Sequence, residues 1–385
     1  MKDVLSKVTI VGMGCCKFGE NWDKGSYDMI IDATFEALED AGIELKDIPA
    51  VWVGCNNELG AASFVADALK LHSIPVSRCE NYCATGMDAF RNACFAVAAG
   101  MYDLVLVVGY EKIKDIPTRG LVIPPIGRGG HPILFRDSAP GSFALAATKY
   151  FEKYGIGRGP LAKIAVKNHH NGSLSPKAHL QREITLEQVL NAPIISWPLG
   201  LFDCCGVTDG AAAAIITRKE MARRFRDDSI TVRGIGLSMS AGAPQWRPGF
   251  EYVGFTESEV AAKQAYEQAG ISNPRKEIDC AEVHDCFTIT EILDYEDLHF
   301  CERGEGWRLI EDGVTNLNGE LPVNMDGGLK CFGHPVGASG LRMIYEIYKQ
   351  LQGKCGVRQV KNAELGLAHT LGGAPSVSAV IILSN

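Results

Sequence analysis

The chain of 385 residues lacks the features that would assign it to a membrane, secreted or nucleic-acid-binding class. It has no apolar run long enough to span a bilayer, and the apolar stretch in "KVTIVGMG" is too short for a signal peptide, so we expect a first strand there. Acidic residues outnumber basic ones, 46 to 38, which argues against nucleic acid or an anionic membrane as the main partner.

Two kinds of cofactor motif are also missing. The sequence contains neither a CxxC pair nor an HExxH segment, so we expect no metal, although "HDC" contains residues that can ligate one. In "VGMGCCKFG" the first two glycines of a dinucleotide fingerprint are present as Gly12 and Gly14, but Lys17 stands at the third. The dinucleotide interpretation therefore fails.

Cysteine, in contrast, is plentiful. Thirteen cysteines include the adjacent pairs Cys15–Cys16 and Cys204–Cys205, which do not fit the disulfide framework of a secreted protein. Free thiols in a chain of this length favour a reducing compartment, and we expect a cytoplasmic location.

Buried strands alternate with amphipathic helices, which predicts an α/β protein with a parallel or mixed sheet. The pattern is interrupted between Glu111 and Pro198, where proline, glycine and histidine are frequent. We interpret this stretch as an inserted excursion of loops and helices.

The second part of the chain repeats the first. "EALEDAGI" matches "QAYEQAGI", "DIPAVWVGCN" aligns with "EIDCAEVHDC", and "ATGMDAF" aligns with "ASGLRMI", all in the same order. We therefore predict two α/β halves of similar topology, residues 1–240 and 241–385, with the inserted loop region at about 111–198 in the first.

Chemically distinctive residues lie at the junctions of these elements. Cys83 opens a predicted helix, His334 opens the matching helix of the second half, and His284 and Cys286 follow a strand. Ligands gather at such junctions in α/β sheets, so these side chains and His369 can converge. A helix amino terminus and an imidazole both lower a thiol pKa, which favours Cys83 as a nucleophile, although most free cysteines are simply buried.

Four segments, "NYCATGMDAF", "VHDCF", "GHPVGASG" and "HTLGGA", together resemble the thiolase superfamily over essentially the whole chain. They resemble most the sterol-carrier-type and archaeal-type branch, which includes acetyl-CoA acetyltransferases and has HDCF where other thiolases have Asn-Glu-Ala-Phe. The resemblance implies a thiolase fold with a five-layer αβαβα core and a homodimer or larger oligomer. It also implies thioester chemistry with coenzyme A as co-substrate and no permanently bound cofactor.

The resemblance also implies a role for each matching residue. Cys83 corresponds to the nucleophile that becomes acylated, and His334 to the histidine that activates it. Cys286 corresponds to the acid/base cysteine, and His284 to a group at the oxyanion site of the thioester carbonyl. Gly372 in "LGGA" would supply, with Cys83, the backbone N–H groups of a second oxyanion hole.

The carboxyl-terminal segment departs from the common thiolase pattern. Other thiolases carry Cys-x-Gly-Gly-Gly there, whereas this chain has "HTLGG" with His369 and no cysteine. Cys286 is then the sole candidate acid/base. The implied reaction is CoA-dependent cleavage of a 3-oxoacyl-CoA through an acyl-cysteine, or the reverse Claisen condensation.

Two alternatives stay open, and a third is disfavoured. A decarboxylating ketoacyl-synthase-like enzyme would use Cys83 with His284 and His334. An HMG-CoA synthase relative would need a glutamate acid/base, for which the position of Glu80 is unsuitable. A non-catalytic acyl-CoA-binding or scaffold subunit is also compatible, because thiolases of this branch are often encoded beside a small zinc-ribbon/OB-fold protein.

The acyl group cannot be specified from the sequence. It ranges from the acetoacetyl group to bulkier aryl or branched groups, as in benzoylsuccinyl-CoA. Candidate pocket residues are the aromatics Phe135, Phe143, Trp197 and Phe202. We expect CoA to enter beside the excursion, where the available basic residues are Arg119, Arg128, Lys163 and Lys167.

Overall fold

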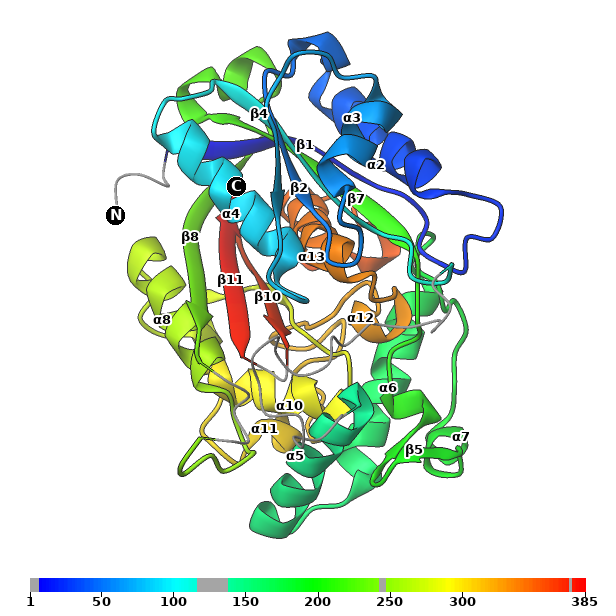
Figure 1. Ribbon diagram of the computed structural model, residues 1–385. Helices are drawn as coiled ribbons and strands as arrows, with labels where there is room; N and C mark the ends of the chain where they lie inside the picture. Colours follow the sequence, from blue (N-terminus) through cyan, green and yellow to red (C-terminus); the bar gives the residue numbers. More distant parts are fainter. Residues whose placement is uncertain (1–6, 116–137, 242–246, 374–375) are drawn as a thin grey trace.

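The protein is built around one mixed β-sheet. The structure, a computed structural model, describes residues 7–115, 138–241, 247–373 and 376–385. Within these residues nine strands pair in the order β3-β2-β4-β7-β1-β8-β11-β10-β9 (Figure 1). The two halves of the chain occupy the two halves of this order, and they meet at β1 and β8.

The first half supplies five strands and three helices. The strands are β1 (Val8–Cys15), β2 (Val51–Gly54), β3 (Val76–Cys79), β4 (Leu104–Glu111) and β7 (Gly210–Arg218). The helices are α2 (Ser26–Ala41), α3 (Ala61–Leu69) and α4 (Thr85–Ala98). β2 is parallel to β3 and β4, whereas β7 is antiparallel to β4 and β1.

The second half repeats this arrangement. Its strands are β8 (Ile230–Met239), β9 (Cys280–Glu282), β10 (Leu365–Gly372) and β11 (Val377–Ser384). Its helices are α8 (Thr256–Ala269), α9 (Pro274–Glu277), α10 (Thr288–Asp297), α11 (Gly306–Glu311), α12 (Gly328–Cys331) and α13 (Val336–Leu351). The order β8-β11-β10-β9 and its strand directions match β1-β7-β4-β2, which confirms the predicted duplication.

Two details support the equivalence of the halves. Helices α2 and α8 occupy matching places and both end at a glycine in the left-handed conformation, Gly42 (φ 67°) and Gly270 (φ 78°). Where β3 stands in the first half, the second half has a single parallel bridge between Val323 and Ala281 of β9. The second half thus has a single bridge in place of an edge strand equivalent to β3.

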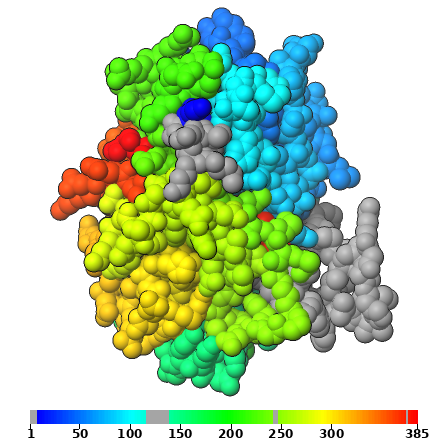
Figure 2. Space-filling model, turned by 90° about the vertical axis from the view of Figure 1, so that its left-hand side faces the viewer, coloured from blue at the N-terminus to red at the C-terminus, as the bar shows by residue number. Residues whose placement is uncertain are grey.

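The layers follow from which helices contact which strands. α4 and α13 pack against each other and contact strands of both halves, whereas α2 lies against β1 and β7 and α8 against β8 and β11. The two half-sheets therefore enclose a central helical layer, and outer helices complete the five layers (Figure 1). Figure 2, viewed from the left of Figure 1, shows the surface on the α8 side of the second half.

The half-sheets are joined by a short antiparallel contact. Thr9 and Ile10 of β1 pair with Thr231 and Ile230 of β8. By its place in the sheet β8 belongs to the second half, where it corresponds to β1, although its residues precede the predicted boundary at residue 240. The division of the chain into residues 1–240 and 241–385 stays a prediction.

The excursion lies between β4 and β7, below the sheet in Figure 1. Its described part contains α5 (Ala139–Tyr154), α6 (Arg158–Ser173), α7 (Leu186–Leu190), β5 (Ile194–Ser196) and β6 (Leu199–Gly200). The segment "IPTRGLVIPPIGRGGHP", interpreted as a loop, lies outside the described residues. No helix in the described part of the chain is long and apolar enough to cross a membrane.

The amino-terminal end of α13 is pressed against the first half. A Cβ built on Gly109 of β4 would lie 2.2 Å from the carbonyl oxygen of Gly337, and one built on Gly86 of α4 would lie 2.7 Å from it. Both distances are too short for real atoms, so each position needs glycine. This backbone contact sets the distance between the amino-terminal end of α13 and the first half.

We expect Gly109→Ala to destabilise the protein by about 1–3 kcal/mol, because the added methyl group meets rigid backbone. The control is Gly159→Ala on α6, where an added Cβ has nothing within 4 Å. Thermal unfolding of the variants, followed by circular dichroism, tests this. Equal midpoints for Gly109→Ala and the unmodified protein would contradict the packing described above.

Candidate active site

The predicted site residues come together where the two halves meet. Cys83 precedes α4, His284 lies between β9 and α10, and His334 precedes α13. One donor atom from each of these three residues lies within 4.8 Å of the other two. The imidazoles of His284 and His334 meet edge to face with their ring centres 5.1 Å apart.

Cys83 sits on a tight turn directly before α4. The preceding Tyr82 has a positive φ of 49°, and the Asn81 carbonyl accepts the N–H of Ala84 at 3.0 Å. The Asn81 N–H in turn donates to the Thr85 hydroxyl at 2.8 Å. This strained turn presents the thiol beside the first turn of the helix.

Two glycines of the segment after β10 meet this turn differently. A Cβ on Gly372 would lie 2.6 Å from the backbone nitrogen of Cys83, so Gly372 packs against the turn. The N–H donor to the Cys83 sulfur comes from Gly373. The expected role of Gly372 as an oxyanion-hole donor stays a prediction.

The expectation that the pKa of Cys83 is lowered is wrong. Burial raises it to about 12, and the N–H of Gly373 offsets only part of this. The neighbouring imidazoles are themselves buried and neutral, so they add no positive charge that would stabilise a thiolate. The free protein therefore holds Cys83 as a thiol, and a base must take its proton.

His334 is arranged as that base. Its Nδ1 lies 2.8 Å from the Ser339 hydroxyl, and that hydroxyl donates its single hydrogen to the Pro335 carbonyl at 2.9 Å. Ser339 must therefore accept from Nδ1–H, which leaves Nε2 unprotonated. Burial, aided by the charge of Arg342, lowers the pKa of His334 to about 3, so the ring is neutral and its Nε2 lone pair is free.

His284 and Cys286 flank the residue that anchors their segment. The Asp285 carboxylate accepts the N–H groups of Leu329 at 2.6 Å and Lys330 at 3.2 Å, and the amide of Asn168 at 2.7 Å. A carboxylate held by three donors fixes the backbone on both sides of it. These hydrogen bonds to Asp285 therefore also position its neighbours, His284 and Cys286.

Cys286 is buried beside another thiol that the sequence analysis did not select. Its carbonyl accepts the N–H of Cys205 at 2.9 Å. Burial first, and then the neighbouring Cys205 and Cys83, raise the pKa of Cys286. The adjacent pair Cys204–Cys205 was the only feature of the sequence that pointed to Cys205, and by itself it indicates a reducing compartment rather than a site.

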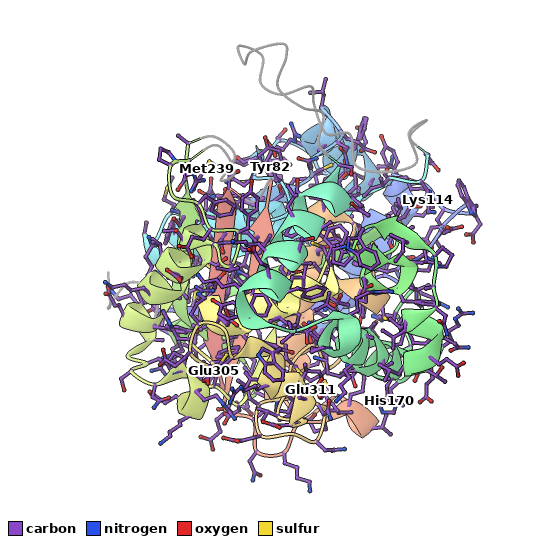
Figure 3. All side chains as sticks on the ribbon, turned by 90° about the horizontal axis from the view of Figure 1, so that it is seen from below. Tyr82, Lys114, His170, Met239, Glu305 and Glu311 are labelled. Carbon is purple, nitrogen blue, oxygen red and sulfur yellow. The ribbon has the colours of Figure 1, made fainter. Side chains whose placement is uncertain are left out.

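Helix α6 supports the site from the excursion. Lys167 forms a buried ion pair with Glu291 and donates to the Val323 carbonyl at 2.9 Å. The expectation that Lys167 is available for CoA phosphates is therefore wrong. Lys163 pairs with Glu311 at the surface, on a cleft of about 630 Å³ whose rim carries the labelled His170 and Glu311 in Figure 3. Arg119 and Arg128 lie outside the described residues.

His369 of β10 neighbours His284 but does not belong to the group formed by Cys83, His284 and His334. Its Nε2 is 3.0 Å from the Ser378 hydroxyl and 3.2 Å from that of Ser258, and its Nδ1 is 3.5 Å from the Asp294 carboxylate. Burial lowers the pKa of His369 to about 4. These partners fit a structural role for His369.

The aromatic residues expected to line the acyl pocket have different surroundings. Phe143 of α5 stacks at 4.9 Å on Phe287, the residue after Cys286. Phe202 packs instead against His169 at 5.7 Å, and Trp197 is 69% exposed. Phe135 lies outside the described residues.

Fold and site together define a duplicated α/β protein with two cysteines and two histidines at the junction of its halves. Residues 8–192 match the family "Thiolase, N-terminal domain", and residues 250–385 match "Thiolase C-terminal domain-like". The chain belongs to the thiolase family, as the motifs predicted, and it is an acyltransferase of that type.

Individual relatives agree with this assignment. An acetyl-CoA acetyltransferase of Methanothermobacter thermautotrophicus is 38% identical, with 99% of this chain and 100% of the relative covered. Sterol carrier protein 2 of Homo sapiens is 32% identical, with 96% of this chain and 70% of the relative covered. A solved structure, "Ltp2-ChsH2(DUF35) aldolase", has a TM-score of 0.84 and 25% identity, with 99% of both chains covered.

The protonation state of Cys83 can be measured directly. Only a thiolate reacts readily with iodoacetamide, so the alkylation rate of Cys83 should rise about tenfold per pH unit between about pH 6 and 9. The rate is followed by mass spectrometry of the peptide that contains Cys83, with a free thiol as the reagent control. A rate that is flat across this range would reveal a preformed thiolate–imidazolium pair and contradict the structure.

Proposed function

We propose that the protein is a thiolase that cleaves a 3-oxoacyl-CoA with free CoA, or runs the reverse Claisen condensation, through an acyl-Cys83 intermediate. Two observations carry this proposal: the Cys83 thiol and one ring nitrogen of His334 lie within 4.8 Å of each other, and Ser339 occupies Nδ1 of His334, which leaves its Nε2 unprotonated and unpartnered. A thiol beside a neutral imidazole acceptor is an activated nucleophile of the kind that acyl transfer requires.

The first half-reaction uses both cysteines. Nε2 of His334 takes the thiol proton as the Cys83 sulfur attacks the 3-oxo carbon, and the N–H of Gly373 stabilises the resulting oxyanion. The bond between the α and β carbons then breaks, and Cys286 protonates the enolate that leaves as a shorter acyl-CoA. His284 donates to the thioester oxygen on which the enolate charge accumulates.

The second half-reaction regenerates the enzyme. The thiol of free CoA passes its proton to the Cys286 thiolate and attacks the acyl-Cys83 carbonyl. The tetrahedral intermediate expels Cys83, which recovers its proton from His334. Each proton taken in one step is returned in another, and the same residues in reverse form a carbon–carbon bond.

Three rival functions make different demands on the site. A decarboxylating synthase needs one cysteine and two histidines but not Cys286, and it would release CO₂ from a malonyl thioester as it condenses it with the acyl-enzyme. A scaffold subunit needs no reactive thiol, so incubation with a 3-oxoacyl-CoA would leave no acyl adduct on Cys83. Retro-aldol cleavage, suggested by the name of the aldolase relative, forms no acyl-enzyme and has no use for Cys83.

We further propose that coenzyme A is the co-substrate, that it enters beside the excursion, and that the protein forms a homodimer or larger oligomer. We also propose a small zinc-ribbon/OB-fold partner, and the paired name of the Ltp2-ChsH2(DUF35) relative supports a partner subunit as such. The acyl group is acetoacetyl or a bulkier aryl or branched group such as benzoylsuccinyl. A thiolysis panel of 3-oxoacyl-CoA esters, with and without the partner, distinguishes these substrates.

Incubation with a 3-oxoacyl-CoA should leave an acyl adduct on the peptide that contains Cys83, detected by mass spectrometry. Cys83→Ser should lower thiolysis by about 10³-fold or more, because serine is a far weaker nucleophile here, while its circular dichroism spectrum stays unchanged. Cys301→Ser is the matched control and should keep full activity. An adduct found only on Cys286 would reverse the assignment.

Cys286→Ala should abolish thiolysis yet leave acylation of Cys83 by a simple acyl-CoA measurable, because that half-reaction moves no proton at the α-carbon. Cys205→Ala and His369→Ala should have milder effects on turnover. The comparison requires kcat and the acylation rate of each variant. Near-normal thiolysis by Cys286→Ala with loss in His369→Ala would place the acid/base in the carboxyl-terminal segment.

A further inference from the structure

We propose that Cys83, His284 and His334 also form a binding site for Zn²⁺ or a similar divalent cation, and that occupancy of this site switches catalysis off. The binding itself is independent of the proposed function, whereas the inhibition rests on it. The ligand class follows from the donors, since open zinc sites use three protein ligands drawn from thiolates, imidazoles and carboxylates.

The donor positions are close to those of a metal centre. All three donor atoms lie within 4.8 Å of one another. With Zn–S near 2.3 Å and Zn–N near 2.0 Å, donors around a tetrahedral ion are about 3.5 Å apart. Separations of up to 4.8 Å must therefore shorten by as much as about 1.3 Å when the ion binds, which requires rotation of the side chains.

Both imidazoles are buried and have an unpartnered nitrogen. Nε2 of His334, in a residue 5% exposed, and Nδ1 of His284, in a residue 1% exposed, have no hydrogen-bond partner in the described part of the chain. Buried nitrogens without partners are uncommon, and a cation supplies what they lack. Neutral rings are also the form that binds metals.

The surroundings of His334 match those of a metal ligand. Metal-bound histidines usually donate their second ring N–H to a fixed acceptor, which orients the lone pair of the other nitrogen. Ser339 does this here at 2.8 Å, and the hydroxyl is itself held by the Pro335 carbonyl. The same contact that prepares His334 as a base thus prepares it as a ligand.

Metal binding and catalysis exclude each other at this site. Binding displaces the proton of Cys83 to solvent and engages both the sulfur and the Nε2 lone pair of His334. The protein then has neither nucleophile nor base. Conversely, an acylated or alkylated Cys83 has no thiolate to offer, so the acyl-enzyme does not bind the cation.

Co²⁺ is the probe, because a tetrahedral cobalt–thiolate complex absorbs in the near ultraviolet and visible, unlike hydrated Co²⁺. Chelator-treated protein titrated with Co²⁺ should develop these bands at one equivalent and lose them on addition of Zn²⁺. Cys83→Ser and iodoacetamide-treated protein should lack the thiolate band, whereas Cys301→Ser should keep it. Ser339→Ala should weaken cobalt affinity by about 10- to 100-fold.

Absence of the thiolate band in the unmodified protein, or its persistence in Cys83→Ser, would overturn the proposal. Thiolysis measured on the same samples should fall as Zn²⁺ is added, with the midpoint found by titration, and recover with a chelator. Zn²⁺ that binds without reducing measurable thiolysis would disprove the switch. If the protein showed the cobalt–thiolate band but no thiolysis, the metal site would stand and the proposed function would be refuted.

Discussion

The site depends on how closely the backbone of α13 approaches the first half of the chain. The carbonyl of Gly337 lies against Gly86 of α4 and Gly109 of β4 at distances that exclude a single side-chain carbon. Cys83 lies three residues before Gly86, and His334 three residues before Gly337. The glycine contact fixes the position of α13 relative to α4. Because both helices are rigid, it also fixes the position of His334 relative to Cys83.

Burial determines the chemistry of the groups that this contact brings together. It raises the pKa of Cys83 and lowers that of His334, so both are neutral in the free protein. A neutral pair costs less to bury than a thiolate–imidazolium pair, and the charge is created only when substrate arrives. The backbone N–H groups of Gly373 and of Cys83 itself donate to the sulfur and offset part of this effect of burial.

The excursion completes the site from outside the duplicated core. Lys167 and Asn168 of α6 reach into the second half, where they hold Glu291 and Asp285. Asp285 is the residue between His284 and Cys286, so an inserted helix fixes a segment of the opposite half. This dependence gives the excursion a structural function that is separate from any contact with CoA.

The sequence alone was sufficient for the family, the duplication and the identity of the converging residues. Local signals carry that information: glycine stops after α2 and α8, matched helix faces, and short motifs at strand and helix ends. The tertiary structure decided the rest. The burial of Lys167, the N–H of Gly373, the proximity of Cys205 to Cys286 and the protonation state of Cys83 depend on which distant groups surround each atom. Desolvation and hydrogen-bond direction arise only from that packing, so no local pattern encodes them.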